Sequence, residues 1–75
     1  MFTKAREKKI IRKIRKEMNG NHIFKFMGLN SIKSEAATLL MNGKISEEFY
    51  IKVFYTGNGK HYTEQNYDYI MNFKA

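Results

Sequence analysis

The apolar side chains in the first part of the chain recur at the spacing of one helix face. Their positions follow the pattern i, i+1, i+4, i+8, and Glu7 extends the same narrow stripe by one turn toward the N-terminus. Asn19-Gly20 then supplies residue types that tolerate the left-handed conformation of a helix C-cap. The pattern therefore predicts a helix over Thr3–Met18. Its apolar stripe consists of Ile10, Ile11, Ile14 and Met18.

The next two segments predict a strand and a second helix. His22–Met27 is short, and its apolar and aromatic side chains occupy much of both faces, as in a fairly central strand. A helix is then expected over Ser31–Met41, because apolar side chains in this range share one helix face. Asn30 or Ser31 would cap its beginning, and Gly43 would end it.

Alternation of side chains between two faces is clearest over Glu48–Tyr55, which predicts a strand. Residues 56–59 have the composition of a hairpin turn, and Lys60–Glu64 would return as the partner strand. Residues 65–74 fit two interpretations. Their alternating aromatic residues slightly favour a strand, whereas Thr63 as an N-cap would begin a helix.

Together these elements predict an α+β fold in a single domain, residues 1–75. The expected order is α-β-α-β-β followed by β or α. The basic N-terminal helix and a second short helix would pack on a small, mainly antiparallel sheet. A chain this short buries a modest core, and a homodimer would cover apolar surface that the monomer leaves exposed.

The composition excludes several classes of protein. There is no cysteine, so neither a disulfide framework nor a cysteine-based zinc site can form. No apolar run is long enough to span a bilayer, and no apolar segment of a signal peptide follows the basic N-terminus. We therefore expect a cytoplasmic protein without a membrane span.

The positive charge is concentrated in the predicted first helix. The chain has a net charge of +7, of which residues 1–18 carry +6 and residues 19–75 only +1. Like charges around one helix repel each other, and cations at a helix N-terminus are unfavourable, so local stability does not select this pattern. We predict that the basic residues bind nucleic acid or an acidic partner. They are Lys4, Arg6, Lys8, Lys9, Arg12, Lys13, Arg15 and Lys16.

Other interpretations of this basic helix are weaker. A charge run is often a solvated face, but here the charge is too localised for that interpretation to be preferred. A basic amphipathic helix can also lie on anionic lipid. Its apolar stripe is narrow, however, and is needed for packing.

A second surface is predicted from the aromatic residues of the chain. Tyr50, Lys52 and Phe54 would share one face of the strand over Glu48–Tyr55, where aromatic rings beside a lysine can stack single-stranded bases. For the aromatic residues as a whole, a place in the hydrophobic core is the stronger interpretation, because so small a domain has few other large side chains.

No set of residues predicts catalysis, a cofactor or a metal site. His22 and His61 are the only histidines, and neither has a carboxylate at a recognisable metal-ligand spacing. The segment Gly57-Asn58-Gly59 lacks the downstream residues of a nucleotide-binding loop. The sequence therefore predicts a protein that is not an enzyme.

The resulting functional hypothesis is a small basic nucleic-acid-binding protein, either a phage or a mobile-element regulator, that binds DNA or RNA through its N-terminal helix. The abundance of Lys, Ile, Asn, Phe, Tyr and Met suggests an AT-rich genome, which suits a bacterial or phage origin. The alternative is a phage-type inhibitor that docks the same basic surface on a host protein or nucleoprotein complex of defence or replication.

Overall fold

The computed structural model describes residues 4–20 and 25–75. In these ranges it contains five helices and no strand, so the predicted α+β fold with a small antiparallel sheet is wrong. The helices are α1 (Lys4–Met18), α2 (Lys25–Met41), α3 (Glu47–Phe54), α4 (Tyr62–Gln65) and α5 (Tyr67–Asn72). None of them is long and apolar enough to cross a membrane.

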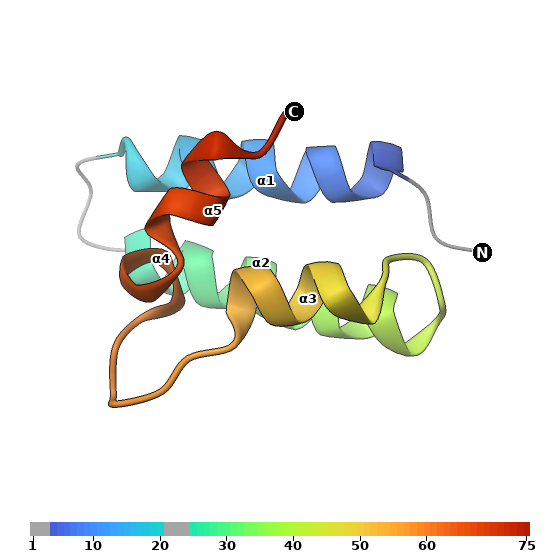
Figure 1. Ribbon diagram of the computed structural model, residues 1–75. Helices are drawn as coiled ribbons and strands as arrows, with labels where there is room; N and C mark the ends of the chain where they lie inside the picture. The colour runs from blue at the N-terminus through green and yellow to red at the C-terminus, as the bar shows by residue number, and fades with distance from the viewer. Residues whose placement is uncertain (1–3, 21–24) are drawn as a thin grey trace.

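The two long helices form an antiparallel pair, and the shorter ones close over it (Figure 1). α2 runs back beneath α1, and α3 then returns beside α2 in the direction of α1. A loop leads from α3 to α4 at one end of the molecule, and α5 crosses over α1. The first and last described helices of the chain therefore lie against each other.

The hydrophobic core lies between these helices, and every helix contributes to it. α1 gives three isoleucines of its predicted stripe, with Met18 packed at the edge. Tyr62 is also buried, and its hydroxyl donates a hydrogen bond of 2.6 Å to the Leu29 carbonyl of α2. The buried apolar side chains are Ile10, Ile11, Ile14, Leu29, Ile32, Ala36, Ile45, Phe49, Val53, Phe54, Tyr62 and Ile70.

Glu7 joins α1 to the beginning of α3. Its side chain is only 3% exposed, as expected for a residue on the apolar stripe. One carboxylate oxygen accepts hydrogen bonds of 3.1 Å from the backbone N–H and from the hydroxyl of Ser46. That hydroxyl also accepts from the Phe49 N–H, which makes Ser46 the N-cap of α3. A buried carboxylate at this helix N-terminus is favoured by the helix dipole.

The second helix begins earlier in the chain than predicted. α2 starts at Lys25, so the predicted strand over His22–Met27 is wrong for Lys25–Met27, and residues 22–24 lie outside the described part of the chain. The predicted caps Asn30 and Ser31 are exposed residues inside the helix. Its end at Met41 is confirmed.

The end of α2 is a Schellman motif. Gly43 has a φ of +69°, the left-handed conformation that glycine adopts without a steric cost. The Gly43 N–H donates to the Leu40 carbonyl, and the Lys44 N–H donates to the Leu39 carbonyl. These two bonds satisfy carbonyls that the helix end would leave without partners.

The strand predicted over Glu48–Tyr55 is the helix α3. All residues of that segment except Glu48 and Lys52 are apolar or aromatic, so its hydrophobic pattern fits both periods. Packing selects the helix, because it buries Phe49 and Val53 on one face. The N-cap with two glutamates after it marks a helix start in the sequence.

The predicted hairpin is also wrong, although its turn is present. Asn58 and Gly59 both have positive φ, and the Lys60 N–H donates to the Gly57 carbonyl, which together make a tight turn of the hairpin type. Yet the segment predicted to return as a strand, Lys60–Glu64, forms most of α4 instead.

The last segment takes the helical alternative. Tyr67–Asn72 is α5, so the slightly favoured strand is wrong. The helical interpretation predicted Thr63 as the N-cap. In the structure His61 is the N-cap of α4, the short helix that precedes α5. Asn66, between the two short helices, donates hydrogen bonds to the Val53 and Tyr55 carbonyls and thereby caps the end of α3.

We expect Glu7→Gln to lower the free energy of unfolding by about 1–3 kcal/mol, because a neutral amide weakens both bonds to Ser46 and buries an N–H₂ group. Urea denaturation would measure the loss. Glu47→Gln is the matched control, since it removes an exposed carboxylate from the first turn of α3. Equal losses in the two variants would contradict a special role for Glu7.

His61 makes stability depend on pH. Burial lowers its pKa from the ordinary value of 6.5, Lys33 lowers it further, and Glu64 opposes them. The cap also requires the neutral ring, because Nδ1 accepts from the Thr63 N–H. The folded protein thus binds this proton more weakly than the unfolded chain, so stability is full above pH 6.5 and falls below it.

The prediction is a smaller free energy of unfolding at about pH 5.5 than at about pH 8. His61→Asn would reduce this dependence, because asparagine is a good N-cap that does not titrate. Urea denaturation of both proteins across the range would test it. An identical pH dependence in wild type and variant would exclude His61 as the cause.

Candidate nucleic-acid interface

The predicted basic helix carries two stripes on opposite sides. The apolar inner stripe has the spacing i, i+1, i+4, i+8, and four cations repeat the same spacing two residues earlier in the chain. Two residues turn through about 200° of a helix, so the cations face away from the core. We call this set the outer stripe: Lys8, Lys9, Arg12 and Lys16.

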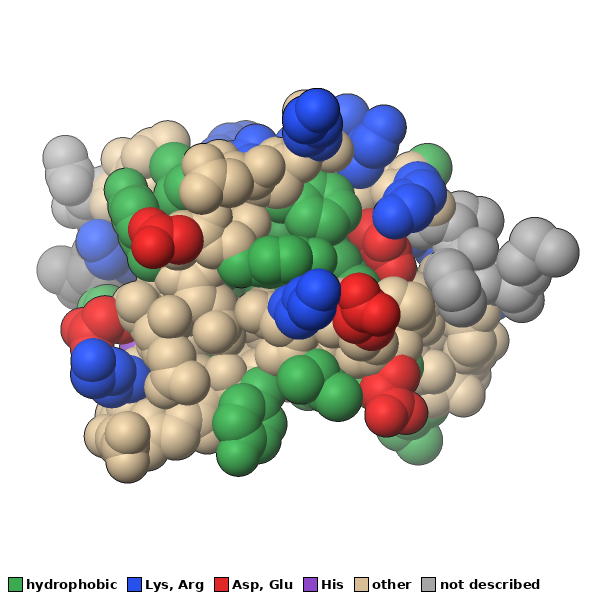
Figure 2. Space-filling model, viewed as in Figure 1, with side chains coloured by type: hydrophobic (Ala, Val, Ile, Leu, Met, Phe, Trp, Pro, Cys, Tyr) green, Lys and Arg blue, Asp and Glu red, His purple; other side chains and the backbone are tan. Residues whose placement is uncertain are grey.

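All four residues of the outer stripe are exposed, and within residues 4–20 and 25–75 none of them forms an ion pair. Lys and Arg side chains gather along the top of the molecule in Figure 2, over α1. The two acids of α1 lie elsewhere. Glu7 is buried, and Glu17 lies against α2. The outer stripe is therefore uniformly cationic.

Arg15 points toward α5 and holds its C-terminal end. Its Nε donates to the Ile70 carbonyl at 3.0 Å, and its Nη2 donates to the carbonyls of Ile70 at 2.8 Å, Met71 at 3.1 Å and also Phe73. These carbonyls lie at a helix end, where they lack partners within the helix. A cation there is also favoured by the helix dipole. Arg15 therefore has a structural role that its position in a basic run does not reveal.

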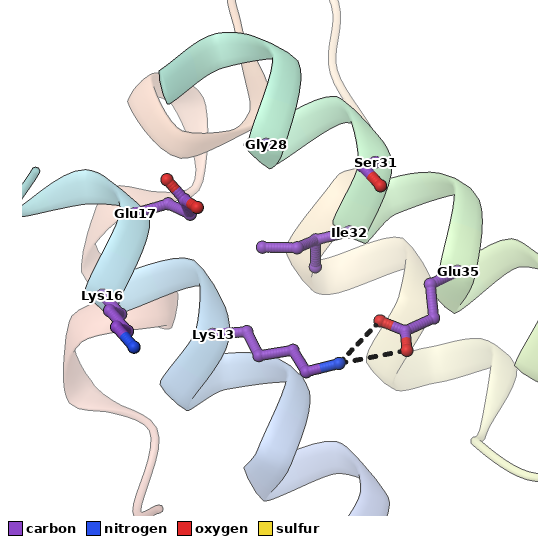
Figure 3. A pocket seen from close by; sticks show the side chains of 7 residues that line it. All are labelled: Lys13, Lys16, Glu17, Gly28, Ser31, Ile32 and Glu35. Carbon is purple, nitrogen blue, oxygen red and sulfur yellow. Dashed lines mark hydrogen bonds and ion pairs between the residues drawn. The ribbon is translucent and has the colours of Figure 1, made fainter. Parts of the chain in front are cut away.

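Lys13 is also engaged within the fold. Its Nζ lies 3.0 Å from one carboxylate oxygen of Glu35 on α2 and 3.1 Å from the other (Figure 3). Both side chains are substantially exposed, so this ion pair contributes at most about 1 kcal/mol. Lys4 and Arg6, the remaining predicted cations, are exposed on the first turn of α1.

A hollow of about 380 Å³ lies between α1 and α2, beside this ion pair (Figure 3). Its two lysines are matched by two carboxylates, so it does not favour an anion. The Glu17 side chain lies against Gly28 here: a Cβ on Gly28 would lie 2.8 Å from a Glu17 carboxylate oxygen. The hollow is lined by Lys13, Lys16, Glu17, Gly28, Ser31, Ile32 and Glu35.

The structure does not bring the predicted secondary surface together. Phe54 is fully buried and Tyr50 packs on it, with ring centroids 5.1 Å apart. Lys52 instead pairs with Glu48 at 3.2 Å, and its Nζ lies 5.8 Å from the centre of the Tyr69 ring. The shared face of these three residues depended on a strand that is absent, because helical geometry separates Lys52 from the other two.

Most aromatic residues of the C-terminal half take the predicted place in or against the core. Phe49, Phe54 and Tyr62 are buried, whereas Tyr55 and Tyr67 are largely exposed. No group of three or more His, Asp or Glu side chains in the described ranges could hold a metal ion. His61 acts as a helix cap, as shown above.

A second hollow, which unlike the first is basic, lies at the beginning of α1, and the sequence indicates only half of its lining. Its volume is about 410 Å³, and it is lined by Lys4 and Lys8 from α1 and by Phe73 and Lys74 from the segment after α5. Phe73 and Lys74 are far from Lys4 and Lys8 in the sequence, and no local motif links them. Only the crossing of α5 over α1 brings them together.

Comparisons with protein-family models, with curated proteins and with solved structures found no match.

We expect Arg15→Lys to lower the free energy of unfolding by about 1–2 kcal/mol, because lysine keeps the charge but cannot reach several carbonyls with one planar group. Arg12→Lys, the same change on the outer stripe, should leave stability unchanged. Thermal or urea denaturation of the two variants would compare them. Equal stability of both variants would show that Arg15 does not hold α5.

Proposed function

We propose that this protein binds nucleic acid through the outer stripe of α1. The observation that carries the proposal is the segregation of charge around one helix. Four cations line the exposed side, and both acids of the helix are turned away from it. A polyanion laid along this side would meet these four cations, with carboxylates nearby at the hollow beside Lys16.

The dimensions of the outer stripe suit a phosphate backbone. Lys8 and Lys16 are eight residues apart, which corresponds to about 12 Å along the helix axis. Phosphates of one DNA strand are spaced by about 3.4 Å along the duplex axis, so the stripe spans roughly three or four of them. Binding would release condensed counterions from these phosphates, and the gain in their entropy would drive association.

The charge pattern costs stability in the free protein. Lys8 and Arg12, and Arg12 and Lys16, are like-charged pairs at i, i+4, and each costs a few tenths of a kcal/mol. No ion pair in the described ranges offsets this repulsion on the outer stripe, although Glu17 and Glu35 line the same hollow as Lys16. A bound phosphate backbone would offset it, which favours binding over a merely solvated surface.

The test compares two triple variants with the same change in net charge. Lys9, Arg12 and Lys16 are changed to Gln in the first, which empties most of the outer stripe. The control changes Lys33, Lys44 and Lys60 to Gln, all of them outside α1. Fluorescence anisotropy with labelled duplex DNA, single-stranded DNA and RNA would measure affinity at several salt concentrations.

We expect the wild-type protein to bind with a dissociation constant of micromolar order or below at low salt. The outer-stripe variant should bind more weakly, with the slope of log K against log salt reduced by about two to three. The control variant should keep most of that slope. Equal losses in both variants would contradict the outer stripe as the contact surface.

Failure of the folded wild-type protein to bind any of the three nucleic acids would reject the proposal. The same cations would then be tested on an acidic surface of a host protein or nucleoprotein complex, the alternative that shares this surface.

A further inference from the structure

We propose that the hollow formed by Lys4, Lys8, Phe73 and Lys74 binds an unpaired nucleotide of a single-stranded nucleic acid. The base would stack on Phe73, and the lysines would hold its phosphates. This inference rests on the proposed function, which it narrows from nucleic acid in general to single strands. Nothing in the sequence motifs assigns Phe73 or Lys74 to binding.

The chemistry of the hollow matches a nucleotide. Its volume of about 410 Å³ lies in the range of small-ligand sites. Three of its four lining residues are lysines, none is acidic, and the fourth is an aromatic ring. A nucleotide presents the same combination, an anionic phosphate joined to a flat aromatic base. Figure 2 shows apolar side chains exposed between α1 and α3, with basic side chains above them and both basic and acidic side chains at their right-hand edge.

Phe73 is held in place as a stacking surface. Its ring makes edge contacts with Phe49, at 5.4 Å between centroids, and with Tyr69, at 5.8 Å. Its carbonyl accepts a hydrogen bond from Arg15. A ring that is already fixed loses little conformational freedom when a base binds, so more of the stacking energy appears as affinity. The ring is only partly buried and remains accessible.

A neighbouring hollow shares Phe73 as a lining residue and extends the surface. It measures about 290 Å³ and is lined by Asp68, Tyr69, Asn72 and Phe73. Asp68 disfavours a phosphate there, whereas Tyr69 can stack a base and the Asn72 amide can bond its edge. The two hollows therefore differ in chemistry. Lysines surround Phe73 in one, whereas Tyr69, Asn72 and the acidic Asp68 accompany it in the other.

Lys8 connects this hollow to the proposed nucleic-acid surface. It belongs to the outer stripe and also lines the hollow. A strand lying along α1 can thus pass from the outer stripe into the hollow without leaving a cationic surface. In a duplex the bases are paired and stacked inside the helix, so only an unpaired base can reach Phe73.

The experiment compares two labelled chains of equal length and charge by fluorescence anisotropy. One is a single-stranded oligonucleotide of about ten nucleotides, and the other is the abasic sugar–phosphate chain of the same length. We expect the oligonucleotide to bind about five-fold to a hundred-fold more tightly, the range for stacking of a base on an aromatic ring. Phe73→Leu should remove most of this difference while leaving affinity for the abasic chain unchanged.

A second pair of variants tests the lysines without touching the core. Lys4→Gln with Lys74→Gln should weaken oligonucleotide binding more than Lys44→Gln with Lys60→Gln, which removes the same charge elsewhere. Helical circular dichroism and thermal denaturation would verify that each variant is folded. If Phe73→Leu does not fold, this lysine pair still decides the outcome.

The results separate this inference from the proposed function. Equal affinity of the wild-type protein for both chains would overturn the stacking site and leave outer-stripe binding intact. No affinity for either chain would overturn the stacking site, and no affinity for duplex DNA and RNA in addition would reject the proposed function. A nucleoside monophosphate that displaces the oligonucleotide at an equal concentration would overturn the assignment to a strand, whereas failure to compete supports it.

Discussion

The narrowness of the apolar face of α1 is the constraint on which the rest of the structure depends. A helix surrounded by cations can give the core only one stripe, and Ile10, Ile11 and Ile14 fill it. Two polar side chains, one at the N-terminal end of the stripe and one beside it, add the remaining attachments. Glu7 binds the beginning of α3, and Arg15 binds the end of α5. The isoleucine stripe, Glu7 and Arg15 thus attach α1 to α2, α3 and α5. Without them α1 would remain largely in water.

Because of the same constraint, some cations of α1 stabilise the fold and others remain exposed to solvent. Arg12 and Arg15 are three residues apart, yet one is exposed on the outer stripe and the other closes the fold. Lys13, between them, pairs with Glu35 of α2. The position of each residue around the helix, and not its charge, decides whether it is available to a partner. The outer stripe is what remains after the fold has used the others.

The sequence predicts α1 well because its apolar and charged residues separate cleanly around a helix. The sequence does not predict α3, because apolar side chains occur there at almost every position and fit the spacing of a helix and of a strand alike. There, packing against α2, α4 and α5 overrides the preference of Phe, Tyr, Ile and Val for strands. The Asn58-Gly59 turn is predicted correctly, but a turn does not fix what flanks it.

The role of Arg15 could not be predicted either, because its carbonyl partner Ile70 is 55 residues away. Eight cations on one predicted helix indicate a binding surface without showing which of them the fold itself uses. The same limit applies to the basic hollow, since the sequence places Phe73 and Lys74 in an ambiguous segment that has no cluster of basic residues and lies far from α1 in the chain.

The crossing of α5 over α1 has a consequence for the order in which the protein folds and opens. Contacts between α1 and α2 join segments that are close in the sequence, whereas contacts between α1 and α5 join segments near the two ends of the chain. Bringing distant segments together costs more conformational entropy, so the contacts of α5 form later. Detachment of α5 would therefore be a low-energy partial unfolding that leaves α1 and α2 associated. The outer stripe would survive this opening, because it belongs to α1 alone. The Phe73 hollow would be lost, because it needs residues from both α1 and the segment after α5. On warming, the contribution of base stacking to binding should therefore decrease before that of the outer stripe.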